Sequence, residues 1–241
     1  MTEATPPRLG LLLRELPWFP VIVASRFRRP KKSELGIQLE GKLSPVLVVP
    51  GLMSNDGTTS LLRRTLSRNG FPTYSSRLGL VTGVTDTRLA TARQRLEEMV
   101  ERHEEPAIIV GWSLGGIYGR VLAQRHPELV QMVVTLGTPF SGNRQANNAW
   151  RIYNALNDHT VDAPKLPDNP SEKPPAHTVA VWSPSDGIVA PQSAKGTSDE
   201  RDAEYRLDVT HFAFGAGRRA AEQVTQIVVQ ELAAIRARKA P

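Results

Sequence analysis

The amino-acid sequence predicts an α/β protein with a mostly parallel central sheet and helices on both faces of that sheet. Short apolar runs alternate along the chain with longer stretches whose apolar residues recur at helical spacing. This alternation is typical of a sheet whose parallel strands are connected by helices. The runs are apolar at nearly every position, as expected for strands that are covered on both faces. The 241 residues are enough for one such domain with a substantial core.

The individual elements follow from local signals along the chain. A strand over 45–50 is followed by polar residues near Asn55 that start a helix, and Gly70 ends that helix. Thr85 begins a long helix in which apolar residues recur every three or four positions. The expected strands cover 45–50, 71–77, 107–112, 131–136, 178–182 and 205–209, and the expected helices cover 55–69, 85–105, 117–126 and 216–236.

The first 34 residues stand outside this alternation and form an N-terminal amphipathic segment. One helix is expected over 9–16, and Pro17 and Pro20 are expected to break any helix that continues. This helix either packs on the domain or lies on a membrane surface. Packing is expected, because the apolar faces of helices in soluble chains are usually buried.

A second segment, 141–176, also interrupts the alternation of strands and helices. It is polar and proline-rich, and it is too long for a plain connection between two strands. Its first part, 146–156, is a helix candidate. Because the segment leaves the sheet at the edge where a functional site is expected, we interpret it as a lid or cap inserted into the core. The core would then cover 35–140 and 177–241.

The charge of the chain limits its partners. The formal net charge is +6, and basic residues gather over 26–32 and 236–239. No recognition helix, zinc finger or RNA-binding pattern accompanies these clusters, so no nucleic-acid partner is expected. The first cluster offers a peripheral contact with an anionic membrane. The apolar stretch 9–24 is too short and too interrupted for a transmembrane helix or a signal peptide, so a cytoplasmic location is expected.

The most informative motif is G-x-S-x-G at residues 111–115. An apolar run leads into it and a helical stretch leads out. This is the setting of a nucleophile elbow, in which a serine stands on a sharp strand-to-helix turn and projects its hydroxyl from the sheet edge. Glycines on both sides remove the Cβ atoms that would collide in such a turn. Ser113 is therefore the candidate nucleophile, and the alternative is a serine that merely caps a helix.

A serine nucleophile needs a base, and the base needs an orienting carboxylate. Both should follow strands, at the carboxyl edge where the sites of parallel sheets lie. Among the histidines after Ser113, His211 lies between the last expected strand and the final helix, whereas His126 ends a helix, His159 falls in the insertion and His177 precedes a strand. We therefore predict that His211 is the base.

Asp186 is the candidate carboxylate, because it follows the strand expected over 178–182. Its rivals are Asp199 and Asp202, which lie in a charged loop, and Asp208, which lies within a strand candidate. A carboxylate in a loop after a strand is the better placed to reach an imidazole at the same edge.

An oxyanion hole takes the backbone N–H of the residue after the nucleophile, here Leu114, and a second N–H from the loop after an early strand. In that loop Gly51 permits a close approach, and the Leu52 N–H is the expected second donor, with the Met53 N–H as its rival. Several apolar residues near the candidate loops could bind an apolar acyl group, with core positions as the alternative. They are Met53, Phe140, Trp150, Ile188 and Phe212.

Five motifs give the chain a resemblance to a known family. They are Val-Pro-Gly at 49–51, Gly-Trp-Ser-Leu-Gly-Gly at 111–116, Leu-Gly-Thr-Pro at 136–139, Asp-Gly-Ile-Val at 186–189 and Thr-His-Phe at 210–212. Over about residues 35–238 the chain resembles the α/β-hydrolases of the lipase and esterase kind. The resemblance implies a compact α/β-hydrolase fold, a triad of Ser113, Asp186 and His211, ester substrates, and no cofactor or metal. Pro50 departs from the family, which commonly has a histidine before the oxyanion glycine.

Motifs and resemblance together lead to the hypothesis of a serine carboxylester hydrolase, an esterase or lipase. It would act through an acyl-enzyme on small-molecule or lipid esters with apolar acyl groups. The main alternative is an acyltransferase or thioesterase that uses the same triad, because the family includes such enzymes. A non-catalytic binding protein with a hydrolase fold is disfavoured, because such proteins usually lack a member of the triad and all three residues are present here.

Overall fold

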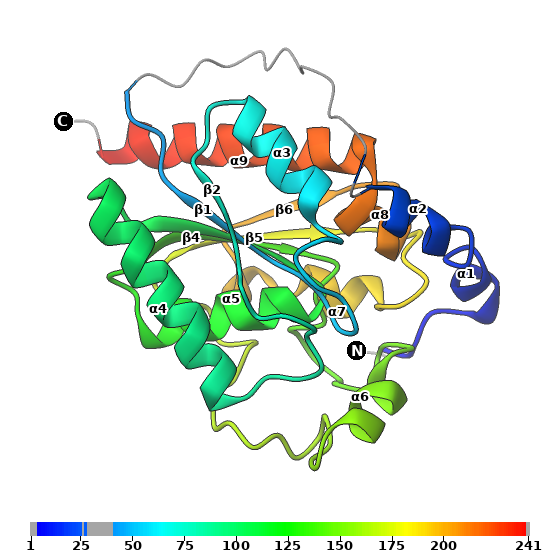
Figure 1. The fold of residues 1–241 in the computed structure, drawn as a ribbon. Helices are drawn as coiled ribbons and strands as arrows, with labels where there is room; N and C mark the ends of the chain where they lie inside the picture. Colours follow the sequence, from blue (N-terminus) through cyan, green and yellow to red (C-terminus); the bar gives the residue numbers. More distant parts are fainter. Residues whose placement is uncertain (1–3, 26, 28–40, 240–241) are drawn as a thin grey trace.

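The computed structural model describes residues 4–25, 27 and 41–239. Within them, six parallel strands form one sheet in the order β2-β1-β3-β4-β5-β6 (Figure 1). The predicted fold class is therefore confirmed. The strands are β1 (Val46–Val49), β2 (Thr73–Ser75), β3 (Ala107–Trp112), β4 (Val130–Leu136), β5 (His177–Trp182) and β6 (Ala203–Arg206).

Helices cover both faces of the sheet (Figure 1). On one face lie α3, α8 and α9, and on the other lie α4 and α5. The Thr85 side chain caps α4 by accepting a hydrogen bond from the Arg88 N–H at 3.3 Å, which is the start that the sequence predicts. The helices that follow β1 along the chain, apart from one in the insertion, are α3 (Ser60–Arg68), α4 (Asp86–His103), α5 (Leu114–Arg125), α7 (Pro191–Lys195), α8 (His211–Ala216) and α9 (Arg218–Lys239).

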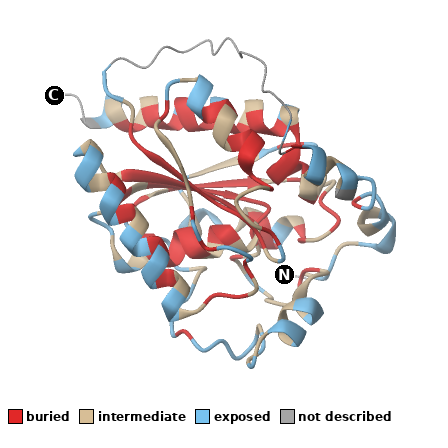
Figure 2. Ribbon diagram, viewed as in Figure 1, coloured by how far each residue is buried: buried red, intermediate tan, exposed pale blue. Residues whose placement is uncertain are grey.

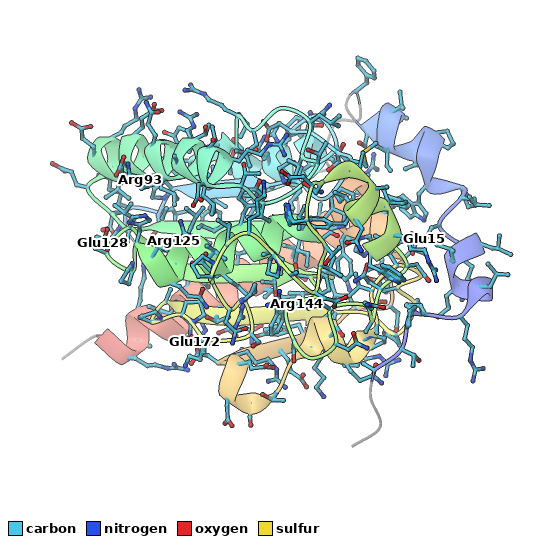
Figure 3. The ribbon with its side chains drawn as sticks, turned by 90° about the horizontal axis from the view of Figure 1, so that it is seen from below. Glu15, Arg93, Arg125, Glu128, Arg144 and Glu172 are labelled. Carbon is cyan, nitrogen blue, oxygen red and sulfur yellow. The ribbon has the colours of Figure 1, made fainter. Side chains whose placement is uncertain are left out.

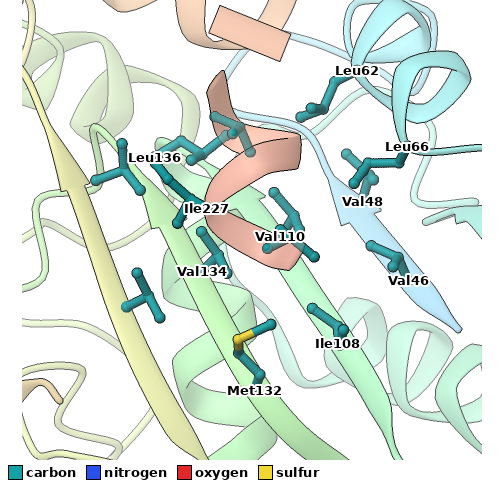
Figure 4. Packing of buried hydrophobic residues seen from close by; sticks show 14 of the residues in the cluster. Val46, Val48, Leu62, Leu66, Ile108, Val110, Met132, Val134, Leu136 and Ile227 are labelled. Atoms are coloured by element: carbon teal, nitrogen blue, oxygen red, sulfur yellow. The ribbon is translucent and has the colours of Figure 1, made fainter. Parts of the chain in front are cut away.

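Alternate residues of the central strands enter two separate cores. Val46 and Val48 of β1 pack with Leu62 and Leu66 of α3 (Figure 4), whereas Leu47 points to the opposite face, toward α4 and α5. The central strands are buried along their length (Figure 2). Each fully buried aliphatic side chain contributes about 1.5–3 kcal/mol, so this sheet is a rigid base for the loops at its edge.

The strand order places a topological switch point between β1 and β3. The chain leaves β1 toward β2 on one side, and β3 lies on the other side of β1. The loops after these two strands therefore diverge, and a crevice opens between them at the carboxyl edge. The loop after β1 carries Leu52, and the turn after β3 carries Ser113.

Several elements begin or end a few residues from their expected bounds, and β2 covers only Thr73–Ser75 of the strand expected over 71–77. Helix α3 begins at Ser60 rather than near Asn55, because Asn55 Oδ1 accepts the Gly57 N–H at 2.9 Å and holds the preceding residues in a turn. Strand β6 ends at Arg206, three residues before the expected end. The final helix α9 begins at Arg218, two residues after its expected start, and a separate short helix, α8, covers His211 to Ala216, where a loop was expected; Gly217 between them has an extended backbone.

The N-terminal segment contains two helices, α1 (Leu9–Leu13) and α2 (Trp18–Ser25). The prediction that Pro20 breaks any helix is wrong, since Pro20 lies in the first turn of α2, where the missing N–H would have no partner within the helix. The helix expected over 9–16 ends at Leu13, and the segment packs on the domain as expected, with Glu15 buried and the Leu11 backbone against Gly187, but not through its whole apolar face. Leu9, Leu13 and Leu16 are 67, 54 and 56% exposed, and the segment is attached by other contacts, described below.

The predicted basic cluster over 26–32 lies outside the described residues, except for Phe27. The second cluster lies at the end of α9. In the part of the chain that the structure describes, no helix has the length and apolar character needed to cross a membrane.

The insertion 141–176 contains α6 (Trp150–Leu156), which is shorter than the helix expected over 146–156. Before α6, Asn147 forms a β-bridge with Val189. After α6, the buried Arg120 side chain of α5 donates hydrogen bonds to the carbonyls of Ser171 at 3.2 Å and Glu172 at 3.3 Å. Both ends of the insertion are thus fixed to the core, while α6 has no buried residue.

Candidate active site

Ser113 stands on the turn between β3 and α5, and its backbone is strained. Its φ is 54° and its ψ is −123°, a conformation that a residue with a side chain rarely adopts. The turn is crowded, because a Cβ on Gly111 would lie 2.3 Å from the Gly115 carbonyl oxygen, and one on Gly115 would lie 2.2 Å from the Val49 oxygen. A side chain at either position would collide with the backbone, so this turn requires the two glycines that the motif supplies.

His211 and Asp186 form a buried pair at the same edge of the sheet. His211 Nδ1 and Asp186 Oδ2 are 2.8 Å apart, and the two residues are 3% and 1% exposed. The other carboxylate oxygen of Asp186 accepts the N–H groups of Ile188 and Val189, both at 2.8 Å. These two bonds fix the carboxylate, which in turn fixes the Nδ1 side of the imidazole and leaves Nε2 available.

Long-range contacts hold His211 against the serine strand. The Trp112 indole N–H donates to the His211 carbonyl oxygen at 3.0 Å, and the two rings are 5.6 Å apart. A Cβ on Gly137, whose φ is 52°, would lie 2.8 Å from Asp186 Oδ2. The loops after β3, β4 and β5 and the start of α8 therefore converge on one point. Among the described residues, His211 Nδ1 bonds to Asp186, and no hydrogen bond joins Ser113 to His211.

Opposing influences set the basicity of His211. Burial of the imidazole is the largest and lowers its pKa, whereas the charge and hydrogen bond of Asp186 and the charge of Glu15 raise it. The net effect is a pKa above the ordinary 6.5. An imidazole with a raised pKa is a stronger base, and the carboxylates stabilise its protonated form.

The loop after β1 presses on the serine turn and carries the candidate oxyanion donors. A Cβ on Gly51 would lie 2.9 Å from Ser113 Cβ. The Met53 N–H donates to the Val81 carbonyl oxygen at 2.7 Å, so it is engaged elsewhere. Leu52 lies beside Ser113 and Leu114 at the cavity described next. Leu114 is the first residue of α5, so its N–H has no acceptor within that helix.

A cavity of about 170 Å³ opens at Ser113. More of its wall is apolar than polar, and the insertion supplies most of the lining residues. Of the predicted acyl-binding residues, Phe140, Trp150 and Ile188 line it. Met53 is absent from its wall and is 53% exposed. Phe212 also lies outside the wall, with its ring 6.0 Å from that of His211. Further apolar lining residues, which sequence proximity did not suggest, include Val84, Ile117, Val121, Val161 and Leu166.

The rival candidates lie elsewhere and have partners of their own. None of the three other downstream histidines lines the cavity at Ser113. Their nearest polar partners are Glu128 for His126 at 3.6 Å, Tyr153 for His159 at 3.0 Å and Glu231 for His177 at 2.6 Å. The rival aspartates have neighbours at the surface, which are Ser198 for Asp199, Lys173 for Asp202 and Arg206 for Asp208.

Sequence reasoning missed Glu15, which contacts this site from the N-terminal segment. Its side chain is buried and accepts the backbone N–H groups of His211 and Phe212. The two partners are almost two hundred positions away in the chain, so no local spacing could have indicated the contact. Among the described residues, no group of three or more acidic or histidine side chains is arranged to hold a metal ion.

The sequence profile of the alpha/beta hydrolase fold family matches residues 69–194, slightly more than half of the chain. The chain belongs to this family. A search of curated proteins gives no significant sequence match.

Solved structures share the fold at low sequence identity. A monoacylglycerol lipase from Paleococcus ferrophilus is 16% identical with a TM-score of 0.55, and the match covers 78% of this chain and 96% of the lipase. The carboxylesterase EstE1 from a metagenomic library is 13% identical with a TM-score of 0.60, covering 90% and 96%. A thioesterase domain from the curacin biosynthetic pathway is 14% identical with a TM-score of 0.53, covering 78% and 91%.

Proposed function

We propose that this protein is a serine carboxylester hydrolase that acts through an acyl-enzyme on esters with apolar acyl groups. One observation carries the proposal. A serine with a strained backbone opens onto an apolar cavity, and a buried histidine–carboxylate pair lies at the same edge of the sheet. Lipases and esterases among the structural neighbours are consistent with this function, and the family membership supplies a fold that hosts it.

In the proposed mechanism, Ser113 Oγ attacks the ester carbonyl carbon while His211 Nε2 takes the hydroxyl proton. Asp186 holds the Nδ1–H and stabilises the imidazolium that results. The tetrahedral intermediate collapses when Nε2 gives the proton to the departing alkoxide, and the acyl group stays on Ser113. A water molecule then attacks the acyl-enzyme while Nε2 takes a proton from it. Nε2 returns this proton to Ser113 Oγ as the carboxylic acid product leaves.

The negative oxygen of the intermediate needs donors in place before the reaction. We assign these to the backbone N–H groups of Leu52 and Leu114. Both residues flank Ser113 in the cavity wall, and the engagement of the Met53 N–H with Val81 favours Leu52 over its rival. Backbone donors on a loop packed against the serine turn would undergo little rearrangement during the reaction.

The cavity indicates the acyl side of the substrate. Phe140, Trp150 and Ile188 line it and would cover an alkyl or aryl acyl chain. We interpret residues 141–176 as a cap over this chain, within a core of 35–140 and 177–241. Because Arg120 and the bridge at Asn147 fix both ends of the cap, α6 is the part that would move to admit substrate.

Lipid esters are a natural subset of such substrates. The exposed leucines of the N-terminal segment, at positions 9, 13 and 16, lie among Arg8 and Arg14 and would suit peripheral contact with an anionic membrane. The basic cluster over 26–32 would add to this attraction, and a cytoplasmic location stays a prediction from the sequence.

The test is hydrolysis of p-nitrophenyl esters with acyl chains of two to sixteen carbons. We expect turnover, with kcat/KM rising with chain length until the cavity is filled. Failure to hydrolyse any chain length would contradict the proposal. The alternatives, an acyltransferase or thioesterase, share the triad, and a thioesterase domain is among the structural neighbours. Faster release from an acyl thioester, or acyl transfer to an added alcohol in preference to water, would favour them.

A further inference from the structure

Glu15 lies in the loop between α1 and α2, where the N-terminal segment meets the rest of the molecule (Figure 3). It is 1% exposed. Its carboxylate accepts three backbone N–H groups, from Gly187 at 3.0 Å, His211 at 2.7 Å and Phe212 at 3.1 Å. The first of these donors is the residue after Asp186, and the second is the candidate base itself. One carboxylate therefore joins the loop of the acid to the start of the helix that carries the histidine.

The backbone around Glu15 packs closely on the same loops. A Cβ on Gly187 would lie 2.3 Å from the Leu11 carbonyl oxygen, so α1 lies directly against the acid loop. The Asn148 amide donates to the Pro7 oxygen at 3.1 Å and to the Gly187 oxygen at 2.8 Å, which joins the segment to the insertion as well. Arg64 of α3 donates to the Ser25 oxygen at 2.8 Å and fixes the far end. These polar contacts attach the segment at the site, while Leu9, Leu13 and Leu16 stay exposed.

We propose that Glu15 is a positioning residue of the triad. Its carboxylate fixes the loop that carries Asp186 relative to the backbone of His211. The proposal rests on the proposed function of these residues. Burial of an ionised carboxylate is unfavourable unless it is well hydrogen-bonded, and the three amides supply those bonds. Its position behind the pair, outside the cavity wall at Ser113, leaves it no direct role toward substrate.

The charge of Glu15 adds a second effect. Two carboxylates act on His211, because burial lowers its pKa while Asp186 and Glu15 raise it. Asp186 acts at Nδ1, and Glu15 acts from the backbone side of the same residue. When His211 accepts the serine proton it becomes a cation, and both carboxylates then stabilise it. A residue with a purely structural role would lack this electrostatic influence on the reaction.

The experiment compares Glu15→Gln and Glu15→Asp with Glu231→Gln as a matched control. Glu231 is also a buried, hydrogen-bonded glutamate, but it lies at the opposite edge of the sheet. For each variant we would measure the melting temperature and the pH dependence of kcat and KM on p-nitrophenyl butyrate. We would also follow the titration of the His211 ring by NMR.

For Glu15→Gln we expect kcat to fall roughly tenfold, the scale seen when a supporting partner of a functional side chain is lost, with KM nearly unchanged. The acid limb of the pH profile and the His211 titration should both move to lower pH, because a negative charge is removed. Glu15→Asp keeps the charge, so its acid limb should stay close to that of the wild type. Glu231→Gln should lower the melting temperature without moving the limb.

The positioning role would be overturned if the acid limb of the pH profile of Glu15→Gln stays at the wild-type position. This holds whether or not kcat or the melting temperature falls. If Glu15→Gln does not fold, Glu15→Asp decides, since a shortened carboxylate that leaves kcat unchanged would also overturn it. Failure of the proposed function is a different result, because the wild type itself would then show no turnover. An active wild type with an unmoved limb in the variant would contradict only the inference about Glu15.

Discussion

Two histidine–carboxylate pairs lie at opposite ends of the same strand. His211 Nδ1 is 2.8 Å from Asp186, which follows the carboxyl end of β5. His177 is the first residue of β5, and its Nε2 is 2.6 Å from Glu231 of α9. The N···O distances of the two pairs are similar, but the side chains of His177 and Glu231 are each 9% exposed, against 4% and 1% for His211 and Asp186. Their surroundings differ, and the comparison shows what a histidine–carboxylate pair needs before its chemistry becomes available.

The His211 pair lies behind a strained serine that opens onto an apolar cavity. The His177 pair is enclosed by polar partners, since the Tyr205 hydroxyl donates to Glu231 at 2.5 Å and Asp202 lies 3.7 Å from His177 Nδ1. One imidazole nitrogen of His211 remains available, whereas both nitrogens of His177 face carboxylates. A histidine–carboxylate pair thus indicates an active site only where the fold also supplies a nucleophile and room for substrate.

The largest effect should come from Ser113→Ala. We expect kcat to fall roughly 10⁴-fold or more, because the nucleophile is lost. The melting temperature should stay within a few degrees, because the hydroxyl contributes little to the core. Steady-state kinetics and thermal denaturation on the same preparation measure both. Near-full activity in this variant would exclude Ser113 as the nucleophile.

Substitution of the two histidines separates the two pairs directly. His211→Gln should lower kcat on a scale similar to the loss of the serine. His177→Gln should leave kcat within about twofold but lower the free energy of unfolding by about 1–3 kcal/mol, because a buried acceptor on Glu231 loses its partner. Kinetics and urea denaturation of both variants provide the comparison. Equal losses of activity would remove the distinction between the pairs.

The pH dependence of the reaction depends on His211. The base must be neutral to accept the serine proton, and its pKa is raised above the ordinary 6.5. Activity should therefore rise through one ionisation whose midpoint lies above 6.5. A pH series of kcat/KM with a stable ester measures this midpoint. A midpoint well below 6.5 would show that Asp186 and Glu15 do not act on the imidazole as described.

A smaller effect concerns stability in acid at the opposite pair. The hydrogen bond from His177 holds the pKa of Glu231 below its ordinary value. A lowered folded-state pKa contributes stability that is present above the ordinary value, near 4.5, and is lost as the pH falls below it. In Glu231→Gln the melting temperature should therefore fall less between pH 5 and pH 3 than in the wild type. An unchanged slope would mean that this carboxylate contributes nothing to acid sensitivity.

The sequence predicted the central sheet well because its signal is local. The run 107–112 became β3 at the expected bounds, and the glycines around Ser113 predicted the turn that their close contacts require. The position of Asp186 and His211 after strands followed from topology, since loops at the carboxyl ends of parallel strands meet. Their mutual distance and burial needed the folded chain.

The N-terminal segment could not be predicted in the same way. The spacing of Leu9, Leu13 and Leu16 indicates an apolar face, yet these leucines are exposed and the buried residue is Glu15. Periodicity reports which residues share a helix face, but not which face the rest of the chain covers. A carboxylate held by amides from two distant loops leaves no pattern in the sequence around it.

The most direct test of the proposed chemistry is labelling of the purified protein with a fluorophosphonate, followed by mass mapping of the modified peptide. Such a probe reacts with a serine only when a base activates it and an oxyanion site receives the phosphoryl oxygen. We predict a single label on Ser113 that is lost in Ser113→Ala and strongly slowed in His211→Gln, but retained in His177→Gln. A folded protein that takes no label, or one labelled elsewhere, would contradict the assignment of this site.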